Sequence, residues 1–126
     1  MARPPSPTLT DAELRIMRVL WSRPEATNQE IVAAVTDPPL ARNTTMTTLG
    51  VLERKGYVRH RAEGRTFIYS AAIAEDAVRG NALESVIRRF FDGSAKQLVV
   101  KLLDGEHIAP ADRERIQALI DELRDQ

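Results

Sequence analysis

The chain has 126 residues, of which 43% are hydrophobic and 29% charged, and its formal net charge is zero. This length suits one domain, or one small domain with an appendage. The absence of cysteine excludes disulfides and thiolate metal sites. No apolar run approaches the roughly 18 residues that span a membrane, and the N-terminus has no signal-peptide core, so we expect a cytoplasmic protein.

The charge is unevenly distributed along the chain. The stretch from Leu40 to Ser70 carries a net charge of +4, whereas residues 71–126 carry −3. A basic middle followed by an acidic remainder suits a DNA-facing surface and a separate partner surface.

Two capping boxes mark the first two helices. Residues Thr10–Glu13 open a helix that ends near Ser22, because Pro24 cannot continue it. Residues Thr27–Glu30 open a second, short helix, which Pro38 and Pro39 close.

A third helix and a hairpin follow. The helix is predicted over residues 43–55, with Thr45, Leu52 and either Thr48 or Leu49 facing inward, and it stops at a glycine, Gly56. Strand patterns over residues 57–62 and 65–70 flank Glu63-Gly64, which we interpret as a two-residue turn.

The second half of the chain predicts three more helices. The first spans residues 74–91 and ends at Asp92-Gly93; Ser94 caps the next, which Gly105 terminates, and Pro110 opens the last. The fold class is therefore mainly α with a small β-hairpin wing. Residues 1–73 are predicted to form a winged helix-turn-helix DNA-binding domain, and residues 74–126 a helical dimerisation region.

The start of the third helix holds candidate base-reading side chains. Asn43 can pair with adenine, and the hydroxyl and methyl groups of Thr44 and Thr47 can contact base edges, as can the apolar Met46. The alternative is that Asn43 only caps the helix and the threonines only fill surface.

Four basic residues are candidate phosphate contacts: Arg42, Arg54, Lys55 and Arg65. The alternative is a solvated charged face, but a helix-turn-helix pattern followed by a hairpin favours phosphate contact. Arg65, beside the wing turn, is the strongest single candidate.

The aromatic residues and histidines admit other functions. Tyr57, Phe67 and Tyr69 could stack on bases, although core packing of the wing is favoured. His60 is a candidate pH-sensitive group and His107 a candidate metal ligand, but two histidines in different segments make a weak metal site. No nucleophile motif, Gly-rich phosphate loop or paired carboxylates indicate an enzyme, and no cofactor is expected.

Apolar stripes in the second half exceed what isolated helices can bury. Packing against the winged helix is one explanation. A two-fold homodimer is preferred, because it doubles the phosphate contacts and fits a palindromic site. The candidate dimerisation residues are Val86, Ile87, Phe90, Phe91, Leu98, Val99, Leu102, Ile116, Leu119, Ile120 and Leu123.

Several of these segments, in this order, are similar to one known family. The matching pieces are Leu14–Trp21, Thr44–Leu49, Leu52–Gly56, Gly64-Arg65 with Tyr69, and Phe91–Ser94 with Leu98-Val99. Over about residues 9–123 the chain resembles the BlaI/MecI/CopY family of penicillinase-repressor-like transcriptional regulators.

The resemblance implies a dimeric repressor of a palindromic operator, acting in a beta-lactam or cell-wall stress response. It also implies inactivation by cleavage in the C-terminal region, triggered by a membrane-bound sensor protease. The copper-sensing mechanism of some members uses C-terminal cysteines and does not transfer to this cysteine-free chain. Lys101-Leu102 replaces the Asn-Phe pair at which the staphylococcal repressors are cut.

Gly50 and Val51 occupy positions where relatives often carry polar or basic residues. Gly50 lowers helix stability by about 1 kcal/mol relative to alanine, and it would allow close approach to the DNA backbone. Two alternatives to a proteolytically controlled repressor stay open: a winged-helix protein-interaction module that binds no DNA, and a repressor that responds to a small molecule.

Overall fold

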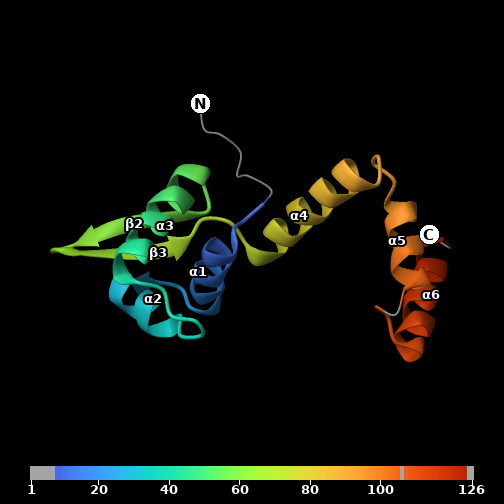
Figure 1. Cartoon of the computed structure of the whole chain (residues 1–126), viewed down its shortest axis with the longest axis horizontal. Helices are drawn as coiled ribbons and strands as arrows, with labels where there is room; N and C mark the ends of the chain where they lie inside the picture. Colours follow the sequence, from blue (N-terminus) through green and yellow to red (C-terminus); the bar gives the residue numbers. More distant parts are fainter. Residues whose placement is uncertain (1–7, 106, 125–126) are drawn as a thin grey trace. The chain divides into compact units, whose positions relative to one another are not determined.

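The structure is a computed structural model that describes residues 8–105 and 107–124, with Ile120, Leu123 and Arg124 described by their backbone alone. It is mainly helical with one small antiparallel sheet, which confirms the predicted fold class (Figure 1). The elements are α1 (Asp11–Ser22), β1 (Ala26–Thr27), α2 (Asn28–Ala34), α3 (Arg42–Lys55), β2 (Val58–Glu63), β3 (Thr66–Ala71), α4 (Glu75–Phe90), α5 (Ala95–Asp104) and α6 (Pro110–Arg124).

The chain divides into two compact units, residues 1–83 and 84–126, so the division falls inside α4. The functional division at residues 73 and 74 stays a prediction.

Both capping boxes form as predicted. The Thr10 hydroxyl accepts from the Glu13 amide at 3.1 Å, and the Glu13 carboxylate accepts from the Thr10 amide at 2.7 Å. Thr27 and Glu30 repeat this arrangement at the start of α2. Helix α2 ends at Ala34, earlier than the predicted stop at the prolines, because Val35 adopts an extended backbone and is buried in the core.

The sheet has the strand order β1-β3-β2. The hairpin turn lies one residue later than predicted: Glu63 pairs with Thr66, so Gly64 and Arg65 form the loop. Gly64 has a φ of 64°, a conformation that favours glycine at the first position of a two-residue turn. The sequence did not predict β1, which has only two residues and pairs with β3.

The core of the first unit joins α1, α2, α3 and the sheet. The fully buried residues of α3 are Thr45, Leu49 and Leu52. Of the two alternatives that the sequence left open, Leu49 and not Thr48 therefore faces inward. The remaining buried hydrophobic residues are Ile16, Met17, Leu20, Ala26, Ile31, Val35, Tyr57, Val58, Tyr69 and Val78.

A largely buried ion pair links α1 to α3. The Lys55 ammonium lies 2.8 Å and 3.0 Å from the two carboxylate oxygens of Glu13, whose side chain is only 3% exposed. Burial by itself raises the pKa of the Glu13 carboxyl. Hydrogen bonds from Lys55 and from Thr10 outweigh that effect and leave the pKa below its usual value of 4.5.

The second unit contains the end of α4 and two further helices. Asp92 and Gly93, at φ 48° and 83°, turn the chain after α4 as predicted. The Ser94 hydroxyl caps α5 by accepting from the Gln97 amide at 3.2 Å, and α6 begins at Pro110. Arg113 of α6 donates to the Gly105 carbonyl at 3.1 Å, which connects the start of α6 to the end of α5.

We expect Lys55→Met to lower the free energy of unfolding by about 2 kcal/mol at pH 7, because it leaves the Glu13 carboxylate buried with fewer partners. The pKa of Glu13 is lower in the folded than in the unfolded chain. Its stabilising contribution is therefore present above pH 4.5 and is lost as the pH falls through the lowered folded value. Urea unfolding at pH 7 and at acidic pH measures both effects.

Lys101→Met is the matched control, because Lys101 is an exposed lysine of α5. It should change stability by less than about 0.5 kcal/mol. Adding Glu13→Gln to Lys55→Met should recover part of the loss. Equal effects of the two single lysine substitutions would contradict a stabilising role for the pair.

Candidate nucleic-acid interface

The outward face of α3 carries small polar side chains. Opposite the buried stripe, Asn43, Thr47, Gly50 and Arg54 follow one another at helical spacing. Met46 lies beside this stripe and is 39% exposed. The face combines amide, hydroxyl and apolar groups, which are the groups that read base edges in a major groove.

The hydroxyl groups of α3 fall into two sets. Thr45 and Thr48 donate to the helix carbonyls of Ala41 and Thr44, at 3.0 Å and 2.7 Å. Thr44 and Thr47 are exposed, and their hydroxyls make no hydrogen bond within the part of the chain that the structure describes. Only the second set can offer its hydroxyls to a ligand without breaking an existing bond.

Asn43 does not cap the helix. Helix α3 begins at Arg42, its N-cap is Ala41, and no side chain bonds to its first amides. The capping alternative for Asn43 is therefore wrong, because Asn43 is the second residue of the helix. Its exposed amide group leaves base contact as the remaining prediction.

The four candidate phosphate-binding residues differ in what they contact. Arg42, Arg54 and Arg65 are exposed and have no ion-pair partner among residues 8–105 and 107–124. Lys55 is 30% exposed and is held by Glu13. The first three are thus available to an anion, and phosphate contact by Lys55 stays a prediction that would have to compete with its ion pair.

Arg65 occupies the wing loop itself. The shifted turn makes it the second loop residue, directly after Gly64, at the tip of the hairpin that extends past the helices (Figure 1). Arg61 is arranged differently: Glu25 binds its guanidinium at 3.0 Å and 3.1 Å, and Glu63 binds it at 2.9 Å. These carboxylates raise the pKa of Arg61, and Arg61 lowers that of Glu25.

The aromatic residues of the wing separate into buried and exposed ones. Tyr57 and Tyr69 are buried, which confirms core packing for both. For Phe67 the core prediction is wrong, since its side chain is 45% exposed and its ring lies 4.6 Å from the His60 ring. The hairpin extends past the helices of the first unit, so they leave Phe67 exposed (Figure 1). A strand pattern in the sequence does not indicate how far a hairpin extends past neighbouring helices.

The second unit exposes apolar side chains. Val86, Phe90, Val99, Leu102 and Leu119 are all exposed, and Phe90 reaches 70%. Ile87, Phe91, Leu98 and Ile116 are half-buried. The side chains of Ile120 and Leu123 lie outside the described residues.

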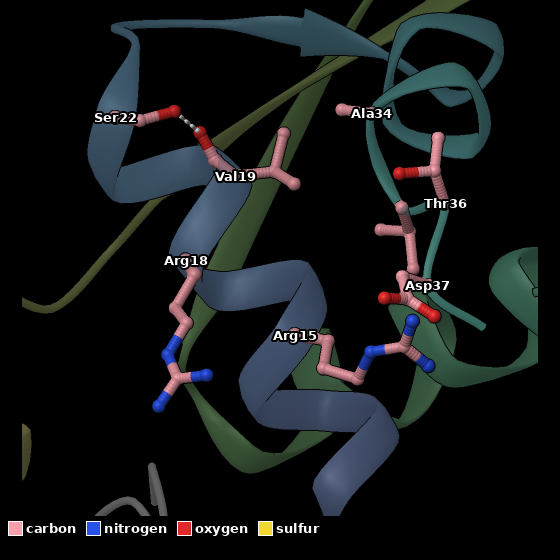
Figure 2. A pocket seen from close by; sticks show the side chains of 8 residues that line it. Arg15, Arg18, Val19, Ser22, Ala34, Thr36 and Asp37 are labelled. Atoms are coloured by element: carbon pink, nitrogen blue, oxygen red, sulfur yellow. Dashed lines mark hydrogen bonds between the residues drawn. The ribbon is translucent and has the colours of Figure 1, made fainter. Parts of the chain in front are cut away.

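A surface hollow of about 370 Å³ lies between α1 and the end of α2 (Figure 2). Arg15 and Arg18 line it from α1, and Thr36 and Asp37 line it after α2. Both signs of charge occur in its lining, and both arginines keep contact with solvent. Among the described residues, no group of three histidine or acidic side chains is placed to hold a metal ion, and no helix is long and apolar enough to cross a membrane.

Comparison with known proteins identifies the architecture. The family model described as penicillinase repressor matches residues 9–122. The chain belongs to the penicillinase repressor family. Members of this family are DNA-binding transcriptional repressors and not enzymes.

Individual relatives cover most of the chain. The penicillinase repressor of Bacillus licheniformis is 26% identical, over 92% of this chain and 91% of its own length. The penicillinase repressor of Staphylococcus aureus is 20% identical, over 89% of this chain and 90% of its own length. The solution structure of the DNA-binding domain of the repressor BlaI is 31% identical with a TM-score of 0.52, and the match covers 58% of this chain and 90% of that one.

Gly50→Ala tests whether DNA approaches the α3 backbone closely. A Cβ atom there would meet only the Arg54 guanidinium, at an ordinary 3.8 Å, so we expect the substitution to stabilise the fold by about 0.5–1 kcal/mol. We expect the same substitution to weaken DNA binding, because the methyl group would stand in the outward stripe. Thermal unfolding and DNA titration measure the two effects.

Gly80→Ala in α4 is the control, because Gly80 is likewise a helical glycine at which a Cβ atom would meet no close contact; nothing lies within 4 Å of it. It should stabilise the fold similarly and leave DNA binding unchanged. Unchanged affinity in both alanine variants would exclude close DNA approach at Gly50.

Proposed function

We propose that the chain represses transcription by binding a palindromic operator as a homodimer, reading bases with the first half of α3 and phosphates with the ends of α3 and the wing loop. The observation that carries this proposal is the set of exposed polar side chains Asn43, Thr44 and Thr47 on α3, with the exposed Arg42 and Arg54 on either side of them along the helix. A recognition helix needs this arrangement, since base contacts specify the sequence and phosphate contacts fix the position of the protein.

The dimer is supported by the apolar surface of residues 84–126. Phe90 and Leu119 are more than half exposed, which is unusual for large apolar side chains gathered in one small unit. A two-fold partner would bury them and would place two recognition helices on the two halves of a palindrome.

The proposal for the control of repression is supported by family membership alone. We propose that the regulated genes answer beta-lactam or cell-wall stress, and that a protease linked to a membrane sensor inactivates the repressor in its C-terminal region. The Lys101-Leu102 bond lies inside α5, with both side chains exposed. A cut there would sever α5 from within the proposed dimerisation region.

Replacing Arg65 with alanine should weaken binding to all DNA sequences, because a phosphate contact carries no sequence information. The slope of log affinity against log salt concentration should become shallower by about 0.9 for each protomer that loses the contact. Fluorescence anisotropy with labelled duplexes at several salt concentrations measures the slope.

Arg115→Ala removes the same charge from an exposed position on α6 and should leave the slope near that of the parent. An Arg65 variant with parent affinity at both low and high salt would refute the wing contact.

Thr47→Ala should instead change the preference among operator variants, and a uniform loss would assign Thr47 a structural role.

Phe90→Asp should dissociate the dimer, because it places a charge at the most exposed aromatic residue of the second unit. Sedimentation equilibrium measures the change as a fall in average mass towards that of one 14.1 kDa chain. Phe67→Asp puts the same charge on the exposed aromatic residue of the wing and should leave the mass unchanged. Dissociation by both substitutions, or by neither, would contradict the proposed interface.

A further inference from the structure

One polar contact joins the recognition helix to the wing. The Nδ1 atom of His60 on β2 lies 2.5 Å from a carboxylate oxygen of Glu53 on α3. Both side chains remain about a third exposed, at 32% and 39%. The pair is therefore close enough for a strong charge-assisted hydrogen bond and open enough to exchange protons with solvent.

The His60 ring contacts one carboxylate, that of Glu53, and lies beside two aromatic rings. From β3, the rings of Phe67 and Tyr69 lie 4.6 Å and 5.7 Å away. Burial, and then the Glu53 charge, raise the pKa of the Tyr69 phenol, so it stays neutral near pH 7. Arg59 and Arg61 adjoin His60 on β2 but point to the other face of the sheet.

The position of Glu53 makes its charge consequential. Glu53 precedes Arg54 in the sequence and borders the outward stripe of α3, so a DNA phosphate bound there would approach a carboxylate. A protonated His60 cancels that negative charge and strengthens the bond that holds β2 against α3. A neutral His60 leaves the charge uncompensated and retains only an ordinary hydrogen bond.

We propose that Glu53 and His60 are positioning residues that make DNA affinity depend on proton binding, so that affinity falls as the pH rises. This inference rests on the proposed function, because it requires α3 and the wing to face the same DNA.

The composition of the chain confines the effect to few groups. It has two histidines, His60 and His107, and no cysteine, so few of its side chains are of a type that ordinarily changes charge between pH 5 and pH 8. One linked proton limits the change to at most about tenfold in affinity per pH unit and protomer. We expect affinity to weaken by about fivefold to tenfold between pH 6 and pH 8.

The test measures the affinity of the full chain for two labelled duplexes from pH 6 to pH 8 at constant ionic strength. One duplex comes from the region upstream of its own gene, and the other has a scrambled sequence. His60→Gln keeps a hydrogen-bond donor without the charge, so it should bind at pH 6 as the parent binds at pH 8, with a flat profile. Glu53→Gln should also flatten the profile and should bind more tightly than the parent at pH 8.

His107→Gln is the matched control and should keep the parent profile. Tighter binding by Glu53→Gln distinguishes an electrostatic role from a structural one, because loss of structure would weaken binding. A parent-like slope in either His60→Gln or Glu53→Gln would overturn the inference while leaving the proposed function intact. Failure of the parent to bind either duplex at pH 6 would instead overturn the proposed function, and this inference with it.

Discussion

The Glu13–Lys55 ion pair is the constraint on which the position of the recognition helix depends. Glu13 completes the capping box that starts α1, and the same carboxylate binds the last residue of α3. One buried group therefore fixes the start of one helix and the end of another. Gly56 follows at φ 91°, and its left-handed conformation lets the chain reverse into β2 directly after the anchored end. The rotation of α3 about its axis follows from this anchor and from its buried Leu49 and Leu52, and that rotation decides which side chains face outward.

The division of labour within α3 follows from that rotation. A threonine on the buried side satisfies its hydroxyl with a carbonyl of its own helix, as Thr45 does, because an unpaired buried hydroxyl is costly. A threonine on the outward side, such as Thr47, has no such requirement. The same residue type thus satisfies its hydroxyl within the helix on one face and keeps it available to a ligand on the other.

Local signals in the sequence were sufficient for most element boundaries. Capping boxes, the stop at Gly56 and the start at Pro110 each depend on neighbouring residues alone, and each prediction was correct. Several departures from the predictions depend on pairing that local signals do not report. Strand β1 exists because β3 pairs with it, and the turn lies one residue later because Glu63 pairs with Thr66. The sequence also did not indicate that Lys55 is bound by a residue 42 positions away. For the candidate site, sequence reasoning located the helix and the loop but could not say which cations are already paired.

Pairing changes how the basic character of the chain should be interpreted. The stretch from Leu40 to Ser70 contains six cationic residues. Of these, Lys55 is bound by Glu13, and Arg61 by Glu25 and Glu63. The other four cationic residues of this stretch have no ion-pair partner among the described residues: Arg42, Arg54, Arg59 and Arg65. If Arg42, Arg54 and Arg65 bind phosphate as proposed, each would contribute a large share of the affinity, because the chain as a whole has zero net charge. A single carboxylate at Glu53 is then a substantial fraction of the local charge, which is why the proposed neutralisation of Glu53 by His60 would have a measurable consequence.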